Sequence, residues 1–249
     1  SVIPSEYMGK KAIIIGASSG IGYEVTRLLL ARGWIVGVAA RRQEKLEEIR
    51  ATAPDRVFIE VIDVTAEDAP ERLRHLVQKT GGMDLYFHAS GIGSLNPELK
   101  RANIEIDTVR TNALGWTQMV GEAYRYFAGQ GKGHLACITS IAGTKGLSPA
   151  PAYSATKAFQ QNYLQALEQQ AHCRNMSIHF TDIRPGFVKT PLLKDSHAFP
   201  MQLSVESVAR SIIRAIDRKR HVKVIDWRWN ILTVAWRSLP RWIWRHIKL

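Results

Sequence analysis

Tyr153 and Lys157 lie four residues apart in a segment with a helical pattern, so we expect both side chains on one face of a helix. Free tyrosine has a pKa of about 10, which is too high for easy proton exchange at neutral pH. A nearby ammonium group, together with the positive ring of an oxidised nicotinamide, would stabilise the phenolate and lower that pKa. The pair is therefore a candidate for general acid–base chemistry, with Tyr153 giving a proton to a carbonyl oxygen or taking one from an alcohol.

A glycine-rich turn between residues 15 and 22 is the second chemical feature. Its spacing is G-x-x-x-G-x-G, directly between an apolar run and a helical pattern. Glycine permits the tight turn, and the helix that follows presents unpaired N–H groups and a positive dipole end to a pyrophosphate. An ordinary glycine-rich turn is the alternative, but the position after a first strand favours a dinucleotide site. The candidate contacts are Gly16, Ser18, Ser19, Gly20, Ile21 and Gly22.

The end of the predicted second strand should select the cofactor. It reads Ala39-Ala40-Arg41-Arg42, with no carboxylate to accept a ribose hydroxyl. Arginine attracts a 2′-phosphate, so NADP is favoured over NAD, with Arg41 the main candidate and Arg42 its neighbour. Either arginine could instead simply face water. Asp63 and the adjacent Val64 are further cofactor candidates, with Asp63 suited to bond the adenine amine or to cap the next helix.

Short apolar runs alternate with helical patterns along the chain. Strands are predicted at Lys11–Ile15, Trp34–Ala40, Arg56–Ile62, Met83–Ala89, His134–Thr139, Ser177–Ile183 and Val222–Asp226. Helices are predicted from Ile21 up to Gly33, and at Gln43–Ala51, Ala66–Lys79, Pro97–Leu114 with continuation through Phe127, and Tyr153–Cys173. This alternation predicts an α/β fold, a Rossmann-type doubly wound parallel sheet of about seven strands with helices on both faces. We expect one dinucleotide-binding catalytic domain over residues 1–249.

Further residues complete a pattern that resembles the short-chain dehydrogenase/reductase family over roughly residues 10–225. Besides the glycine turn and the Tyr/Lys pair, the matching residues are Asp63, Asn112, Ser140, Pro185, Gly186 and Thr190. The resemblance implies that Ser140 hydrogen-bonds the substrate oxygen, Tyr153 exchanges its proton and Lys157 holds the nicotinamide ribose. Asn112 would help to organise a water-linked proton path to Lys157. Pro185, Gly186, Val188 and Thr190 would flank the nicotinamide amide.

One segment departs from the family pattern. Where the family usually has Asn-Asn-Ala-Gly after the fourth strand, this chain has His88-Ala89-Ser90-Gly91. The usual contacts there are largely main-chain, so we expect Ala89 and Gly91 still to contact the cofactor, while the side-chain bracing between strands must differ. His88 is interpreted as a structural hydrogen-bonding residue. The other histidines show no ligand spacing, and no metal site is predicted.

The C-terminal tail carries most of the chain's charge. Residues 218–249 hold nine Lys/Arg and one acid, Asp226, which accounts for +8 of the net +12, and five of the seven tryptophans lie in residues 227–249. We interpret this stretch as an amphipathic extension, with Arg237, Arg241, Arg245 and Lys248 opposite a Trp/Leu/Ile face made of Leu232, Ala235, Trp236, Leu239, Trp242, Ile243 and Ile247. Pro240 must kink it or start a second helix, with Ser238 as a candidate cap.

This pattern favours a helix lying in a membrane interface. Two alternatives stay open: the apolar face could pack against the body or a second subunit, and the arginines could bind an acidic partner such as an acyl carrier or nucleic acid. Because the excess charge is confined to the tail, we expect no nucleic-acid partner. No signal-peptide pattern is seen, so we expect a cytoplasmic protein in peripheral contact with the inner face of a membrane.

The expected activity is NADPH-dependent reduction of a hydrophobic or lipid-like ketone or aldehyde. The apolar stretch Phe187–Leu193 and the residues Phe199–Leu203 would cover the ligand crevice, although they could instead pack on the core. A 3-oxoacyl-carrier-protein-type reductase is the alternative, and a non-catalytic NADP-binding regulator is a third hypothesis. The resemblance also implies a homodimer or homotetramer paired through helices corresponding to 97–127 and 153–173.

Overall fold

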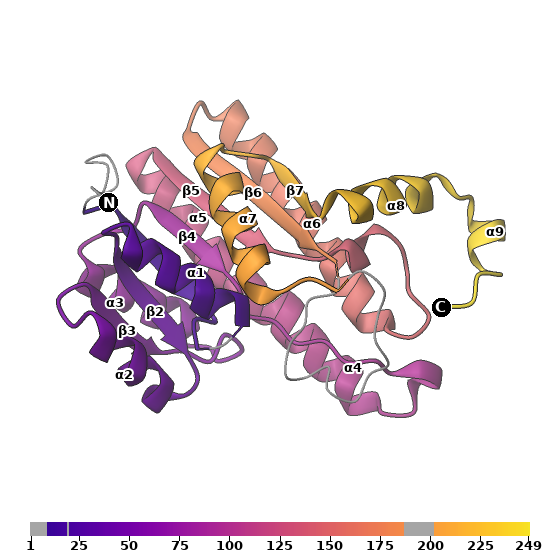
Figure 1. Ribbon diagram of the computed structural model, residues 1–249, viewed down its shortest axis with the longest axis horizontal. Helices are drawn as coiled ribbons and strands as arrows, with labels where there is room; N and C mark the ends of the chain where they lie inside the picture. Colours follow the sequence, from indigo (N-terminus) through magenta and orange to yellow (C-terminus); the bar gives the residue numbers. More distant parts are fainter. Residues whose placement is uncertain (1–8, 19, 187–201) are drawn as a thin grey trace.

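A single seven-stranded parallel sheet forms the centre of the molecule (Figure 1). The computed structural model describes residues 9–18, 20–186 and 202–249. The strands are β1 (Lys11–Ile15), β2 (Ile35–Ala40), β3 (Val57–Val61), β4 (Leu85–His88), β5 (Lys132–Ile138), β6 (Ser177–Pro185) and β7 (Val222–Ile225). Their order is β3-β2-β1-β4-β5-β6-β7, and each neighbouring pair is parallel. The order reverses between β1 and β4, which places a ligand crevice beyond the carboxyl ends of these strands.

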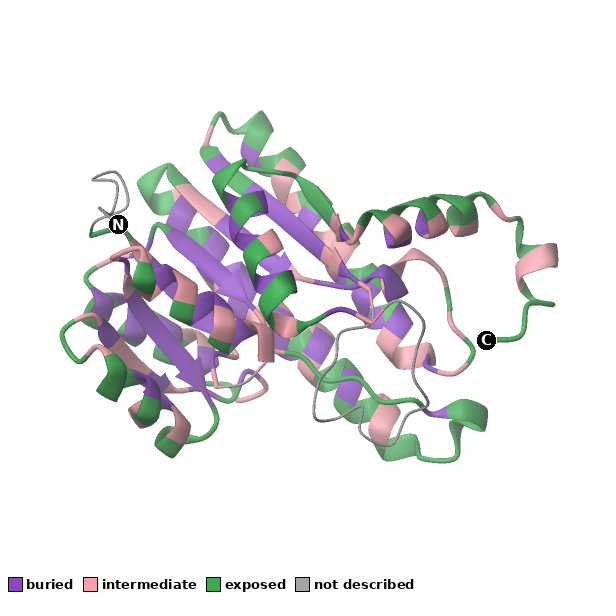
Figure 2. Ribbon diagram, viewed as in Figure 1, coloured by how far each residue is buried: buried purple, intermediate pink, exposed green. Residues whose placement is uncertain are grey.

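Helices cover both faces of this sheet, as predicted, and Figure 2 shows the buried strands between them. One face packs against α1 (Gly20–Ala31), α2 (Gln43–Thr52) and α7 (Val205–Asp217). The other packs against α3 (Ala69–Thr80), α5 (Trp116–Gln130) and α6 (Pro151–Cys173). The Rossmann-type architecture is therefore confirmed.

The long helix predicted from Pro97 is divided into separate pieces. A 3₁₀ turn η2 (Pro97–Leu99) is followed by α4 (Ala102–Val109), a π-helical turn η3 (Arg110–Gly115) and then α5. The side-chain amide of Asn96 donates to the main-chain carbonyl of Arg101 and accepts from its N–H. These bonds hold the segment out of helical geometry, so the helix begins only at Ala102.

One helix, α7, lies outside the elements predicted from the sequence. The Ser204 hydroxyl accepts from the Ser207 N–H and caps the helix, while Val208, Ile212 and Ile216 are buried against the sheet. The spacing of these apolar residues is the usual one for an amphipathic helix.

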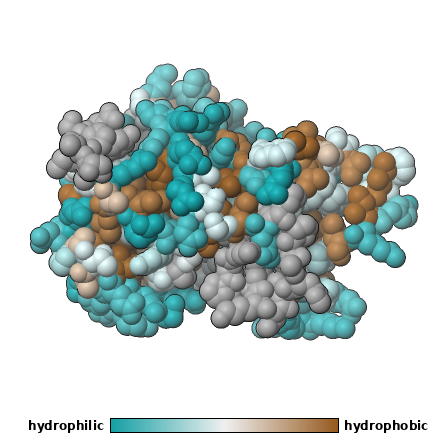
Figure 3. Space-filling view, viewed as in Figure 1, coloured by the Kyte–Doolittle hydropathy of each residue, from teal (hydrophilic) through white to brown (hydrophobic). Residues whose placement is uncertain are grey.

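The tail forms two helices, α8 (Trp227–Ser238) and α9 (Arg241–Trp244), which project at one end of the molecule (Figure 1). Pro240 stands before α9 as its N-cap, so the alternative of a second helix is confirmed and a continuous basic face is wrong. Ser238 is not the cap, because its hydroxyl donates back to the Ala235 carbonyl. Figure 3 shows apolar atoms exposed over α8 and α9. Within the described ranges, no helix is long and apolar enough to span a membrane.

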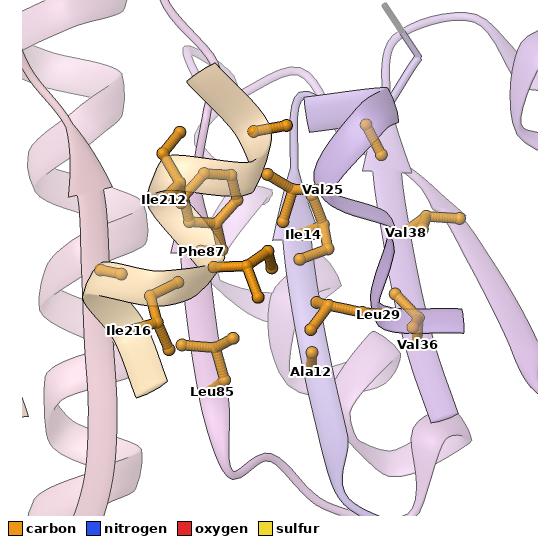
Figure 4. Close-up of a cluster of buried hydrophobic side chains, with 14 of the residues drawn as sticks. Ala12, Ile14, Val25, Leu29, Val36, Val38, Leu85, Phe87, Ile212 and Ile216 are labelled. Carbon is orange, nitrogen blue, oxygen red and sulfur yellow. The ribbon is translucent and has the colours of Figure 1, made fainter. Parts of the chain in front are cut away.

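The core follows from the alternation of side chains along the strands. Ala12 and Ile14 of β1 point into the cluster drawn in Figure 4, where they lie with Phe87 of β4 and Ile212 of α7. Ile13, the residue between them, points into the opposite cluster beneath α3 and α5. Side chains on both faces of β1 are buried, so the strand is held firmly in the sheet. The glycine turn that follows its carboxyl end therefore has a fixed position.

Candidate active site

The glycine turn after β1 packs closely on itself and on the loop after β4. Gly16 has φ of +83°, and a Cβ added there would lie 2.7 Å from the Ser90 amide nitrogen. A Cβ on Gly22 would lie 2.1 Å from the Gly16 carbonyl oxygen and 3.2 Å from the Ala89 Cβ. Because these neighbours are largely main chain and cannot move aside, both positions require glycine. The turn is thus held in a compact cradle at the carboxyl edge of the sheet.

The open side of this cradle is the N-terminus of α1. Gly20 has φ of +60°, and a Cβ added there would meet no described atom within 4 Å. Ser18 and Ile21 are half-buried beside it, and Ser19 lies outside the described residues. The N–H groups of a first helical turn have no partner within the helix, and together with the open position at Gly20 this suits a pyrophosphate.

The ends of β2 and β3 lie beside the cradle. Arg41 and Arg42 are exposed, and neither forms an ion pair with the described part of the chain. Asp63 accepts the Thr65 N–H at 2.9 Å and the Thr65 hydroxyl at 2.7 Å, and these bonds lower its pKa. The interpretation of Asp63 as a helix cap is wrong, because α3 begins after Asp68 instead.

Val64 packs between the end of β3 and the π-helical turn η3. It is buried, and its carbonyl accepts from the side-chain amide of Gln118 at 2.8 Å. A Cβ on Gly115 would lie 2.8 Å from both the Val64 carbonyl oxygen and its Cγ2 atom. Val64 thereby joins the end of β3 to the π-helical turn, and its contact with a cofactor stays a prediction.

The Tyr/Lys pair lies on one face of α6, as the spacing predicts. The Lys157 ammonium is 5.6 Å from the centroid of the Tyr153 ring. Lys157 is buried, and burial lowers its pKa to about 8, against the opposing effects of Cys137 and Asp182. At neutral pH the side chain is therefore still largely a cation.

The pKa of Tyr153 moves in the opposite direction to the one expected. Burial raises it above its ordinary value, and hydrogen bonding with Ser140 offsets only part of that effect. The expected lowering by Lys157 is not seen in the protein alone, because the ammonium faces the ring and desolvation of the phenolate dominates. The phenol is consequently held in its protonated form, which is the form that can act as an acid.

Ser140 is held at the end of β5, facing this pair. Its hydroxyl accepts from the Ala142 N–H at 3.0 Å and caps the 3₁₀ turn η4 (Ile141–Thr144). Its carbonyl accepts from the side-chain amide of Gln161 at 2.7 Å, and the same amide donates to the Thr139 hydroxyl at 3.1 Å. Sequence reasoning missed Gln161, which anchors the Ser140 loop to α6.

Asn112 braces the loop that follows β4. Its side chain accepts from the Ile92 N–H at 3.0 Å and donates to the Ile92 carbonyl at 2.7 Å. A Cβ on Gly91 would lie 3.3 Å from the Asn112 Oδ1 atom and 3.5 Å from the Lys157 ammonium, and one on Gly93 would lie 2.5 Å from the Tyr153 ring. Gly91 and Gly93 thus let the loop run directly over the Tyr/Lys pair. Only Gly91 was predicted.

The main-chain carbonyl of Asn112 accepts from the side chain of Gln160, which the sequence analysis also missed. The Gln160 amide donates from Nε2 to that carbonyl at 2.9 Å. Its Oε1 atom accepts from the Lys157 ammonium at 3.3 Å. The Gln160 side chain therefore links Asn112 to Lys157 directly. The family resemblance implies a link through water between these two residues.

The comparisons with known proteins agree with this geometry. Residues 10–200 match the model of the short chain dehydrogenase family. The chain belongs to that family. An uncharacterised oxidoreductase of Myxococcus xanthus is 33% identical over 222 residues, which are 84% of this chain and 86% of that protein.

Solved structures share the fold of this short-chain dehydrogenase. One from Streptomyces avermitilis, itself described as a short-chain dehydrogenase, superposes with a TM-score of 0.80 at 21% identity, covering 91% of this chain and 92% of its own. A single-residue variant of actinorhodin polyketide ketoreductase, solved with NADPH, gives a TM-score of 0.77 at 20% identity, covering 87% and 95%. The family binds a nicotinamide dinucleotide, and the glycine cradle fits one, because the position of a Cβ on Gly20 is open among the described residues at the N-terminus of α1.

His88, where this short-chain dehydrogenase departs from the family pattern, has the structural role predicted for it. The ring is buried, and its Nδ1 atom pairs with the Tyr86 hydroxyl at 2.7 Å. Burial lowers the pKa of His88 to about 3, so the ring is neutral beside the Lys157 cation. The described residues contain no cluster of three His, Cys, Asp or Glu side chains that could hold a metal.

The C-terminal tail contacts the main chain at the end of β6. A Cβ on Gly186 would lie 2.1 Å from the indole nitrogen of Trp229, so that ring lies directly on the main chain after Pro185. Trp229 is buried and contacts Trp236, which contacts Trp244, whose indole N–H donates to the Gly146 carbonyl. Part of the tail therefore packs on the body. Val188, Thr190 and nearly all of the apolar segment from Phe187 lie outside the described residues.

Proposed function

We propose that this short-chain dehydrogenase is an NADP(H)-dependent enzyme that reduces a hydrophobic or lipid-like ketone or aldehyde. One observation carries the proposal: four elements bring Ser140, Tyr153, Lys157 and the Asn112-braced loop together, beside the glycine cradle. Burial favours the neutral phenol, so Tyr153 is present in the protonated form that carbonyl reduction requires.

Each of the four side chains has a separate task in this mechanism. Ser140 donates a hydrogen bond to the substrate oxygen and keeps its proton, and Tyr153 transfers its own proton to that oxygen as negative charge develops there. The Lys157 cation compensates the phenolate that remains, and it holds the nicotinamide ribose. Asn112 fixes the loop above the pair. The cofactor, when bound, supplies the hydride.

The same cradle and strand ends support a preference for NADP. The cradle, Ile21, Ala89 and Gly91 would hold the pyrophosphate and ribose, and Pro185 and Gly186 would flank the nicotinamide amide. Arg41 and Arg42 are exposed cations beyond β2, and neither is neutralised by a carboxylate within salt-bridge distance among the described residues. A 2′-phosphate would supply the missing anion, while Asp63 stays a candidate for the adenine amine.

The C-terminal extension supports contact with an anionic membrane surface. In α8, Trp229, Thr233 and Trp236 face the body, whereas Trp227, Ile231 and Val234 are exposed on the opposite side. The exposed fractions of these three residues are 69%, 62% and 58%. They form an apolar stripe that the described residues do not cover. The stripe lies within residues 218–249, the segment that carries +8 of the net charge, and this combination suits a lipid interface.

Replacing this stripe with serine at Trp227, Ile231 and Val234 is expected to weaken binding to phosphatidylglycerol vesicles by about tenfold or more, since three apolar side chains no longer leave water. Co-sedimentation measures the effect. The control replaces Leu95 and Leu99 with serine, two exposed apolar residues outside the tail. Unchanged sedimentation of the serine variant, or equal binding of the parent to neutral phosphatidylcholine, would contradict the membrane proposal.

Exposed apolar residues also support a homodimer or homotetramer. Val109 and Leu114 are exposed along α4 and η3, and Phe159 is exposed on α6. These are parts of the two helices through which the family resemblance implies pairing. Burial of these side chains in a partner's matching face would remove apolar area from water.

Consumption of NADPH over a panel of carbonyl compounds tests the proposed function. We expect turnover of long-chain 3-oxo lipids and long-chain aldehydes to exceed that of short polar ketones of the same class. Turnover confined to 3-oxoacyl groups on a carrier protein would indicate the 3-oxoacyl-carrier-protein-type reductase instead. Binding of NADPH without turnover of any carbonyl would indicate a regulator and would overturn the enzymatic proposal.

A further inference from the structure

Gln160 forms a direct bridge between the main chain of η3 and the cation of the Tyr/Lys pair. Its side chain is fully buried. The Nε2 atom donates to the Asn112 carbonyl at 2.9 Å, and the Oε1 atom accepts from the Lys157 ammonium at 3.3 Å. A carbonyl can only accept and an ammonium can only donate, so one orientation of the amide satisfies both partners.

The π-helical turn makes the Asn112 carbonyl available for this bond. In an α-helix that carbonyl would accept the N–H of Trp116, four residues later. Here the Trp116 N–H points to the carbonyls of Thr111 and Ala113 instead. Single π turns of this kind recur at functional sites because they redirect main-chain groups. The displaced carbonyl faces α6, where Gln160 meets it.

Groups from four elements surround the Lys157 ammonium, and they differ in whether they can accept a hydrogen bond from it. His88 from β4 is neutral, and the Cys137 thiol from β5 is buried with its pKa raised. Asp182 from β6 is occupied by the Arg184 guanidinium and the Thr139 hydroxyl. On α6 itself, Tyr153 presents its ring. In the described part of the chain, Gln160 is the only acceptor within hydrogen-bond distance of the ammonium.

We infer that Gln160 is a positioning residue for the reaction, one that fixes the Lys157 ammonium and keeps it charged by tying it to the displaced Asn112 carbonyl. The inference deepens the proposed function and rests on it for its catalytic consequence. A hydrogen bond to a buried cation stabilises the charged form, so its loss must lower the pKa of that cation. Gln160 thus acts through Lys157, because the hydrogen bonds of its side chain go to the Lys157 ammonium and the Asn112 carbonyl.

Two substitutions at this position should shift the pKa of Lys157 in opposite directions. Gln160→Leu removes the acceptor, and we expect the pKa to fall by about one pH unit from its value of about 8. Gln160→Glu places a carboxylate beside the ammonium, and the pKa should rise. The measurement is a titration followed by NMR of protein labelled with ¹³C at the lysine ε-carbon, with the resonance assigned through Lys157→Arg.

The same shifts should appear in kinetics. Because the protonated Lys157 is the competent form, the rate of carbonyl reduction should fall as pH rises through its pKa. That decline should move to lower pH in Gln160→Leu and to higher pH in Gln160→Glu. Gln165→Leu, the same change at an exposed position of α6, should leave both the titration and the profile as in the parent.

The outcomes separate this inference from the proposed function. Shifts of the same sign in both variants, or no shift in either, would overturn the positioning role. If Gln160→Leu does not fold, Gln160→Met, which also removes the acceptor at a similar size, takes its place in the titration and should likewise lower the pKa of Lys157. Opposite shifts in a protein that turns over no carbonyl would support the bridge while the proposed function fails.

Discussion

The variant Tyr153→Phe is expected to reduce carbonyl turnover by about a thousandfold, with the affinity for NADPH nearly unchanged. General acid catalysis by a positioned side chain contributes about 10²- to 10⁴-fold to a rate, and phenylalanine keeps the ring while removing the only proton that Tyr153 can transfer. The ring contacts with Gly93 and with the Lys157 ammonium would persist, so the loop over the pair should stay in place.

The matched control for this change is Tyr163→Phe. Tyr163 lies in the same helix, and its ring packs against Trp116 and Phe159, contacts that phenylalanine keeps. Single-turnover reduction and NADPH binding by fluorescence should be measured on both variants. Near-parental turnover by Tyr153→Phe would show that another group supplies the proton, and the assignment of the acid would be wrong.

The substitution Arg41→Ala should produce the second largest effect, on the choice of dinucleotide. A charge-assisted hydrogen bond is worth about 1.5–3 kcal/mol, so the affinity for NADPH should fall by about ten- to a hundredfold. The affinity for NADH should hardly change, since NADH lacks the 2′-phosphate. Arg41 is exposed, and its removal leaves no buried group without a partner. The measurement is the dissociation constant of each dinucleotide by calorimetry.

Arg42→Ala provides the comparison for this prediction. Arg42 is the residue before α2 and is also exposed, but it lies one residue further from the end of β2 than Arg41 does. We expect a smaller loss of NADPH affinity than for Arg41→Ala. Equal affinities of the parent protein for NADPH and NADH would remove the basis for an NADP preference, whatever the variants do.

The sheet could be predicted well because each strand carries its own local signal. The bounds of β1 match the prediction at both ends, since an unbroken apolar run stops at the first glycine of the turn. The division of the predicted helix at Pro97 could not be read in the same way. It depends on the Asn96 side chain taking the main-chain groups of Arg101. The break of the tail at Pro240 was anticipated from the sequence, but a helical wheel does not reveal which stripe of the tail meets the body.

In the candidate site too, some residues are marked by a local sequence motif, and others are marked only by contacts formed in the fold. Tyr153, Lys157 and Ser140 gather as their motif predicts, because strand and helix ends place them at one edge of the sheet. Gln160 and Trp229 carry no comparable signal. Their importance comes from partners that are distant in sequence, the Asn112 carbonyl and Gly186. In the sequence, Gln160 is marked only as a polar residue one turn after Lys157 in the predicted helix.

The contact between Trp229 and Gly186 also constrains how this chain could have evolved. A Cβ at position 186 and an indole at position 229 would require the same space, with 2.1 Å between them. A chain with a larger residue at position 186 could not hold the tail in its present packing. Any relative that replaces the glycine would therefore also need a smaller side chain at position 229 or a different path for the tail.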